Sequence, residues 1–245
     1  MNWSPVTAKT LSLLTLLGRG LEAAVLPNAC VFCGTRCRPE QAAICKDCHA
    51  DLPWIENACG RCANPVEAVL PGGVHCSRCQ ADPPPFDATI TPLDYSFPVD
   101  AAIKAMKFRR KLCYVPAFAH LLAESMQRLP GEIDALLPVP LHWVRHATRG
   151  FNQAAELCRP LSKLTGLPLV RNVMRTRATP YQSGLVARHR QGNLQSAFSV
   201  RAALHADHVL IVDDVVTTGE TCRELAKVLL DAGVEKVSVI AVARA

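Results

Sequence analysis

The pattern of apolar and polar positions divides the chain into three parts. Residues 1–27 carry an apolar stripe typical of one amphipathic helix that ends near Pro27. Residues 28–82 lack the periodic apolar pattern of a hydrophobic core, so something else has to stabilise them. Four residues, Asp82-Pro83-Pro84-Pro85, form a stiff linker. We therefore expect three domains, at residues 1–27, 28–82 and 86–245.

In residues 86–245, short apolar runs alternate with helical patterns. This alternation is typical of an α/β fold, with a mostly parallel sheet and helices on its faces. A basic run at residues 107–111 interrupts one long helical region. Gly233 ends a second predicted helix, at residues 220–232. The pattern predicts strands at residues 135–140, 208–212 and 236–243, and helices at residues 101–126, 152–165 and 220–232.

Composition and charge narrow the functional classes only slightly. The apolar fraction of 49% indicates a globular chain. The net charge of +6 arises in residues 86–245, which hold 20 basic and 14 acidic side chains, but such an excess is weak support for nucleic-acid binding. The apolar stretch from Leu11 to Leu17 is too short to cross a bilayer, and no signal-type cleavage site follows it. We expect a cytoplasmic protein without a transmembrane segment.

Eight of the twelve cysteines form four C-x-x-C pairs, which indicates metal binding. Each pair places two sulfurs on one tight turn, and two pairs complete a tetrahedral thiolate site for zinc. Tandem pairing, first with second and third with fourth, is the simplest arrangement, while a cross-braced arrangement stays open. A closed four-sulfur site has no position for water, so we predict two structural zinc ions. The expected ligands are Cys30, Cys33, Cys45, Cys48, Cys59, Cys62, Cys76 and Cys79.

The other four cysteines stand outside these pairs. We interpret Cys37 as a surface residue rather than a spare ligand. Cys113, Cys158 and Cys222 lie on predicted helices, and we expect them to be small core residues.

The sharpest motif is an apolar strand from Val209 to Val212, followed by two acidic residues and a threonine-rich loop. Such a strand holds the loop at the carboxyl edge of the sheet, where α/β proteins bind ligands. The amides at the start of the next helix, together with threonine hydroxyls, suit a phosphate. Carboxylates beside that phosphate suit the vicinal hydroxyls of a sugar and a hydrated magnesium ion. The motif therefore predicts a sugar-phosphate site, with a strand ending in a solvated acidic turn as the alternative.

This motif resembles the fingerprint of the type I phosphoribosyltransferases at every position. The resemblance implies that Asp213 and Asp214 contact the ribose hydroxyls at the catalytic position. It also implies that the following loop holds the 5′-phosphate of phosphoribosyl pyrophosphate, with Mg²⁺ accompanying this donor. The loop residues are Val215, Val216, Thr217, Thr218, Gly219, Glu220 and Thr221.

A second segment follows the predicted strand at residues 135–140 and ends in R-x-x-x-R-G-F-N-Q. Two guanidinium groups four residues apart suit one anion, although solvated helix residues are the alternative. We expect the pyrophosphate to contact Leu141, His142, Arg145 and Arg149.

This signature narrows the resemblance to the ComF family of competence-associated proteins, from about residue 28 to the end of the chain. The family joins a zinc module to a phosphoribosyltransferase-like domain, which implies a role in DNA uptake with DNA-uptake proteins as partners. Residues 172–195 resemble the mobile flap of related transferases by order and polarity.

A basic run with nearby aromatic residues offers a weaker site for single-stranded DNA. A solvated helix face is the alternative interpretation. The residues concerned are Lys104, Lys107, Arg109, Arg110 and Lys111.

Three functions stay open at this level. The first is a donor-binding protein acting in DNA uptake, and the second is an active phosphoribosyltransferase with an acceptor that the sequence does not identify. A ligand-sensing regulator ranks third because no helix-turn-helix pattern is evident.

Overall fold

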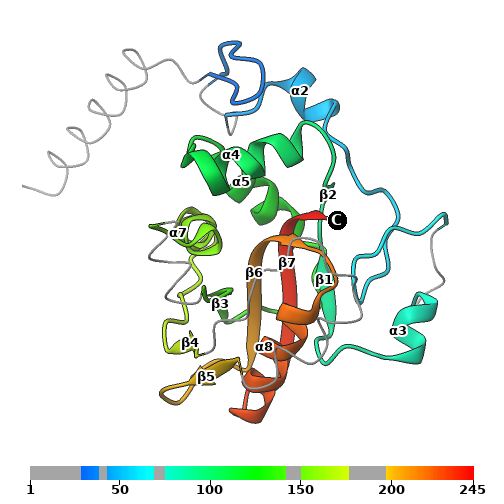
Figure 1. Ribbon diagram of the computed structural model, residues 1–245, viewed down its shortest axis with the longest axis vertical. Helices are drawn as coiled ribbons and strands as arrows, with labels where there is room; N and C mark the ends of the chain where they lie inside the picture. Colours follow the sequence, from blue (N-terminus) through cyan, green and yellow to red (C-terminus); the bar gives the residue numbers. More distant parts are fainter. Residues whose placement is uncertain (1–28, 39–42, 69–74, 142–149, 177–196) are drawn as a thin grey trace, which may run out of the picture. The chain divides into compact units, whose positions relative to one another are not determined.

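The computed structural model of the chain describes residues 29–38, 43–68, 75–141, 150–176 and 197–245 (Figure 1). The helix predicted over residues 1–27 lies outside them. The chain divides into two compact units, Met1–Asp51 and Leu52–Ala245. This division falls inside the predicted cysteine-rich region, so the second pair of C-x-x-C motifs belongs to the unit that contains the sheet.

Most elements follow the predicted order, with strands and helices alternating along the second unit. In the first unit the described residues form one short helix, α2 (Lys46–Ala50). The second unit contains α3 (Ser77–Ala81), β1 (Ala88–Ile90), β2 (Leu93–Asp94), α4 (Val99–Arg109), α5 (Tyr114–Met126), β3 (Ala135–Pro138), α7 (Gln153–Thr165), β4 (Val173–Arg175), β5 (Phe198–Val200), β6 (His208–Val216), α8 (Glu220–Asp231) and β7 (Lys236–Arg244).

The main sheet of the second unit has the order β1-β7-β6-β3, and β2 also pairs with β7 (Figure 1). Every pair in this sheet is parallel, which confirms the predicted fold class. Strands β6 and β7 form its centre, with Val212 opposite Ile240 and Asp213 opposite Ala241. Because the strands are parallel, their carboxyl ends meet at one edge of the sheet, and this edge is where Asp213 and Asp214 lie.

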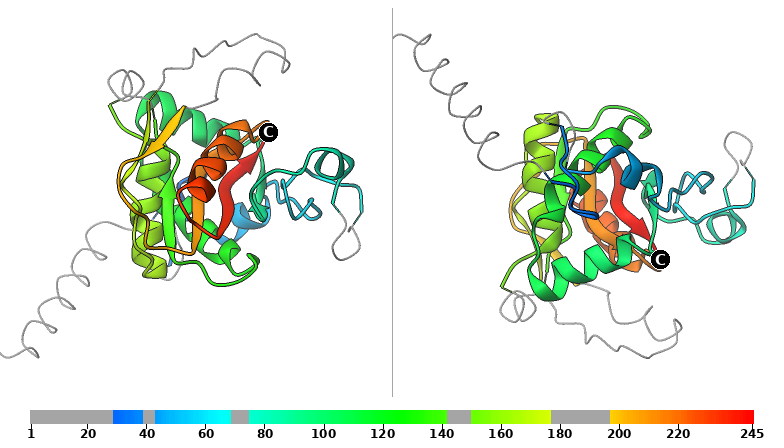
Figure 2. Two further views of the ribbon diagram at one scale, coloured as in Figure 1. Left: turned by 90° about the horizontal axis from the view of Figure 1, so that it is seen from below. Right: turned by 90° about the horizontal axis from the view of Figure 1, so that it is seen from above.

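Helices cover both faces of the sheet, so its central strands are apolar on both sides (Figures 1 and 2). Helix α8 packs on the face formed by Val209, Ile211 and Val239. Helices α5 and α7 pack on each other and on β7, β6 and β3. Because side chains alternate along a strand, this second layer meets the other buried set, which includes Leu210 and Val212.

The basic run separates two helices, as the sequence predicts. Helix α4 ends at Arg109, Arg110 adopts a left-handed conformation with φ of 53°, and α5 begins at Tyr114. Sequence patterns missed the short edge strands β1 and β2 and the antiparallel pair β4 and β5, because three-residue strands carry too little periodicity. Strands β4 and β5 flank residues 177–196, which lie outside the described residues and include most of the predicted flap at residues 172–195.

None of the helices in the described part of the chain combines the length and the apolar character that crossing a bilayer requires.

Candidate functional site

Each unit contains one cluster of four cysteines. In the first, the Sγ atoms of Cys30, Cys33, Cys45 and Cys48 lie within 4.8 Å of one another, and in the second so do those of Cys59, Cys62, Cys76 and Cys79. The Sγ atoms of Cys33 and Cys45 are 3.7 Å apart, and those of Cys62 and Cys76 are 3.6 Å apart. Four sulfurs at about 2.3 Å from a tetrahedral zinc lie about 3.8 Å from one another. Both clusters therefore fit structural zinc, in the tandem pairing.

The other cysteines divide between the core and the surface. Cys158 and Cys222 are buried, which confirms the prediction. The prediction for Cys113 was wrong: this residue is exposed, because it lies at the N-cap of α5, between the basic run and the first turn of the helix, and not on the buried helix face. Cys37 was also misjudged, since it is 5% exposed beside the first cluster and its Sγ lies 3.8 Å from the Thr35 carbonyl oxygen.

The motif around the acidic pair has the local structure that its sequence predicts. Strand β6 carries Asp213 and Asp214 near its carboxyl end, and α8 begins at Glu220. Gly219 connects them with φ of 79°, a left-handed conformation that an L side chain rarely adopts. The chain therefore passes directly from a rigid strand into a helix start.

The two neighbouring carboxylates differ in their burial and in their partners. Asp214 is 6% exposed, and its Oδ1 lies 3.0 Å from the Nζ of Lys107 on α4. Burial alone lowers the pKa of Lys107, but the Asp214 carboxylate outweighs it and raises that pKa. Burial, with a further contribution from the Asp214 charge, raises the pKa of Asp213 to about 7. One carboxylate is thus paired with a cation, and the other holds its proton more tightly than an exposed aspartate does.

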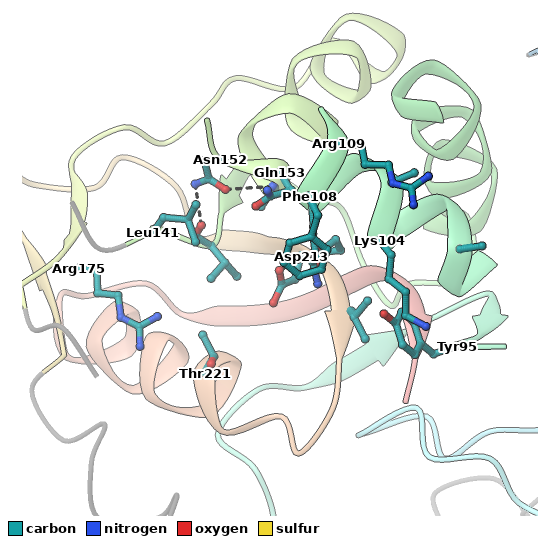
Figure 3. Close-up of a pocket in the computed structure, with 17 residues that line it drawn as sticks. Tyr95, Lys104, Phe108, Arg109, Leu141, Asn152, Gln153, Arg175, Asp213 and Thr221 are labelled. Atoms are coloured by element: carbon teal, nitrogen blue, oxygen red, sulfur yellow. Dashed lines mark hydrogen bonds and ion pairs between the residues drawn. The ribbon is translucent and has the colours of Figure 1, made fainter. Parts of the chain in front are cut away.

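Both carboxylates open into one cavity of about 720 Å³ (Figure 3). In Figure 3, Asp213 lies centrally, with Arg175 and Thr221 to one side and Tyr95 and Lys104 to the other. Basic, aromatic and acidic groups therefore surround a single space. Its lining consists of Tyr95, Ala101, Lys104, Ala105, Lys107, Phe108, Arg109, Val139, Leu141, Asn152, Gln153, Ala154, Arg175, Asp213, Asp214, Val215 and Thr221.

The G-F-N-Q end of the second motif has a structural basis. The side-chain Oδ1 of Asn152 accepts from the amide of Ala154 at 3.0 Å and so caps α7, while its Nδ2 donates to the Val139 carbonyl oxygen at 2.9 Å. Gln153 is 3% exposed and lines the cavity, and its Nε2 has no hydrogen-bond acceptor among the described residues. A buried amide donor without a partner costs free energy, so it indicates a ligand that supplies an acceptor.

The structure brings only part of the predicted donor loop to this cavity. Val215 and Thr221 line it, whereas Val216 is buried in the core under α8 and Thr217 is exposed. Thr218 and Gly219 line a smaller recess of about 20 Å³ on the other side of the loop. Glu220 begins α8, with its Oε1 4.0 Å from the Nε of Arg223.

Of the residues predicted to contact pyrophosphate or DNA, only some line the cavity. Leu141 lines the cavity, but His142, Arg145 and Arg149 lie outside the described residues. Of the five basic residues proposed for DNA, three line the same cavity, and Arg110 and Lys111 are exposed. The Arg110 guanidinium lies over the Phe151 ring, 5.6 Å from its centroid.

Sequence reasoning missed the ion pair of Lys107 with Asp214 and the position of Tyr95 in the cavity. No short-range pattern marks either one, because both depend on how α4 folds back over the carboxyl edge of the sheet. The residue Gln153 lay within the quoted signature, but only its burial shows that it faces the cavity.

Comparison with known families defines the class of protein. Residues 21–80 match the double zinc ribbon domain, and residues 115–245 match the phosphoribosyl transferase domain. The chain is therefore a phosphoribosyltransferase-fold protein with a double zinc ribbon.

Similar curated proteins narrow this class further. The DNA utilization protein YhgH of Escherichia coli strain K12 is 36% identical over 221 residues, which cover 87% of this chain and 96% of that protein. Competence protein F of Haemophilus influenzae is 30% identical over 228 residues, covering 88% and 96%. A hypoxanthine/guanine phosphoribosyltransferase of Methanosalsum zhilinae is 37% identical over 82 residues, covering 34% and 42%. The chain belongs to the ComF family.

Proposed function

We propose that the chain binds phosphoribosyl pyrophosphate with Mg²⁺ at the carboxyl end of β6 and acts in the cytoplasm in DNA uptake. It would do so by binding single-stranded DNA or proteins of the uptake system. The observation that carries the proposal is the single cavity in which the acidic pair meets Lys107, Gln153 and Thr221.

The donor's charges and hydrogen-bonding groups match this cavity. Asp213 and Asp214 accept hydrogen bonds from the ribose hydroxyls, and the loop from Thr217 to Thr221 holds the 5′-phosphate. Lys107 neutralises one carboxylate, so the cavity repels an anionic donor less than it would with two unpaired carboxylates. Mg²⁺, a hard cation, takes phosphate and carboxylate oxygens and neutralises charge as it does in other phosphate sites.

Gln153 and the segment after β3 are the proposed contacts of the pyrophosphate. The unpartnered Nε2 of Gln153 donates to a ligand oxygen. Further contacts with the pyrophosphate are those that the sequence predicts, from Leu141, His142, Arg145 and Arg149. The charge of Arg175 lowers the pKa of Asp213, which is the effect expected of a cation facing the same ligand.

The DNA role rests on the basic and aromatic side chains of the same cavity. Lys104 and Arg109 line it together with Phe108, whose side chain is 71% exposed. The Lys104 ammonium also lies over the Tyr95 ring, 5.8 Å from its centroid. Cations interleaved with aromatic faces suit stacked bases and a phosphate backbone. The names of the two bacterial relatives, which refer to DNA utilization and competence, support this setting.

Because the residues proposed for the donor and for DNA line the same cavity, binding of one should affect binding of the other. Fluorescence anisotropy of a labelled single strand, with and without magnesium and the donor, tests this directly. We expect the donor to change the affinity for DNA at least severalfold, in either direction. Equal affinity for DNA in both conditions, at donor saturation, would argue against a shared site.

The second candidate is an active phosphoribosyltransferase, favoured by the similarity over 82 residues to the Methanosalsum enzyme. Catalysis would come from positioning and from stabilising the departing pyrophosphate. Pyrophosphate release that depends on both an added nucleobase and Asp213 would establish this activity.

A further inference from the structure

Two arginines connect the second zinc ribbon to the phosphate loop within one compact unit. Arg78, which precedes the zinc ligand Cys79, donates from Nη2 to the Thr218 carbonyl oxygen at 3.2 Å. Arg244 is 6% exposed, and its Nη1 donates to the carbonyl oxygens of Val216, at 3.0 Å, and Thr217. Three consecutive carbonyl groups of the loop are therefore held from the side of the ribbon.

The hydrogen bonds from the arginines to the loop carbonyls also fix the direction of the loop N–H groups. In a trans peptide unit the C=O and the following N–H point in opposite directions. When the carbonyls of Val216, Thr217 and Thr218 point at the arginines, the N–H groups of Thr217, Thr218 and Gly219 point away from them. The hydrogen bonds of the described residues leave these three amides unused. They are the donors that a 5′-phosphate needs.

The ribbon in turn holds these arginines. The Nη2 of Arg244 donates to Asn64 Oδ1 at 3.4 Å, and the Asn64 carbonyl oxygen accepts from the Cys59 amide at 2.9 Å. Arg78 lies inside the second C-x-x-C turn of the same cluster. The zinc-binding turn therefore positions Arg78, and Asn64 of the same ribbon helps to orient the Arg244 guanidinium, so both groups depend on the fold of a ribbon that a bound metal stabilises.

We propose that the second zinc ribbon is part of the phosphate site: Arg78 and Arg244 are positioning residues that orient the loop amides toward the 5′-phosphate. This inference rests on the proposed donor site and adds to it a dependence of donor affinity on zinc at the second cluster. The first ribbon has no part in it.

The chain supplies a matched control for Arg78. Arg61 precedes Cys62 as Arg78 precedes Cys79, but its Nη2 donates to the Pro84 carbonyl oxygen at 3.0 Å and not to the loop. Isothermal titration of the full chain with phosphoribosyl pyrophosphate and Mg²⁺ compares Arg78→Ala with Arg61→Ala. We expect Arg78→Ala to weaken donor binding about fivefold to tenfold, as for the loss of one hydrogen bond of typical net strength, and Arg61→Ala to leave it unchanged.

Two further readouts separate positioning from general destabilisation. Magnesium pyrophosphate, which lacks the 5′-phosphate, should bind Arg78→Ala and the unchanged chain equally, and Arg78→Lys should recover part of the donor affinity. Cys62→Ser and Cys33→Ser each should remove one zinc by metal analysis, but only Cys62→Ser should weaken donor binding. If Cys62→Ser does not fold, the arginine comparison decides.

Equal donor affinity in Arg78→Ala and Arg61→Ala would overturn the inference, as would equal weakening in Cys33→Ser and Cys62→Ser. Absence of donor binding by the unchanged chain would instead refute the proposed function, and this inference with it.

Discussion

Replacing Lys107 by Met tests the cation that lies against the acidic pair. The substitution keeps the apolar stem of the side chain and removes only the charge. It leaves Asp214 buried, with its side chain 9% exposed, and without the ammonium group 3.0 Å away. We therefore expect both the stability of the second unit and its affinity for the donor to fall.

The magnitude follows from the geometry. At 3.0 Å and an effective dielectric constant of about 20, the attraction is about 5–6 kcal/mol before desolvation is subtracted. Removing one partner of a fully buried pair costs about 3–5 kcal/mol, and because the Lys107 side chain is 21% exposed we expect about 2 kcal/mol. For a chain of this size that corresponds to a fall in Tm of about 4–8 °C. The uncompensated carboxylate should also weaken donor binding by about 10- to 100-fold.

Lys104→Met is the matched control because it removes the same group from the same helix. Lys104 pairs with Asp100 at 2.6 Å, and its side chain is 55% exposed, so the pair should contribute little. Differential scanning calorimetry and isothermal titration of both variants provide the comparison. The double variant Lys107→Met, Asp214→Asn should recover most of the lost stability, because no unpaired charge is then buried. If the two lysine variants lower Tm equally, the ion pair does not have the role assigned to it.

Further expectations concern Gly219 of the loop, the ionisation of Asp213 and the binding of single-stranded DNA. Gly219→Ala should cost about 1–2 kcal/mol through backbone strain alone, since its Cβ would meet no atom within 4 Å, and should weaken donor binding. Gly166→Ala, at φ of 77° beyond α7, should lower Tm similarly without changing donor affinity, and calorimetry distinguishes them. Because the pKa of Asp213 is raised to about 7, donor affinity should increase about tenfold for each unit by which pH increases toward 7, and should stay constant above it. The variant Asp213→Asn should lack this pH dependence. The same raised pKa should lower the free energy of unfolding as pH rises from about 4 to 7. Arg109→Gln should reduce the slope of log binding constant against log salt concentration, measured for single-stranded DNA, by about one. An unchanged slope would exclude Arg109 as a phosphate contact.

The sequence predicts the strand, loop and helix of the acidic motif because all of their determinants are local. The four apolar residues from Val209 to Val212 are all buried in β6, and Gly219 supplies the left-handed turn before α8. The zinc ligands are equally legible, because each C-x-x-C fixes two sulfurs on one turn. Only the choice between tandem and cross-braced pairing needs the structure, since spacing alone allows both.

Long-range contacts are what the sequence does not supply. Lys107 belongs to a basic run that has the composition of a solvated face, yet α4 brings it onto Asp214. Arg244 lies in an apolar strand, and its burial depends on the loop carbonyls and on Asn64, 180 residues away in the chain. Both residues are charged groups whose partners come from distant elements, so composition favours exposure where tertiary structure produces burial.

Calorimetric titration of the unchanged chain with phosphoribosyl pyrophosphate and Mg²⁺, beside the variant Asp213→Asn, Asp214→Asn, tests the donor site most directly. We expect one binding event per chain that requires Mg²⁺ and is lost in the double variant while its fold is retained. No heat of binding to the unchanged chain, or the same affinity in the variant, would contradict it.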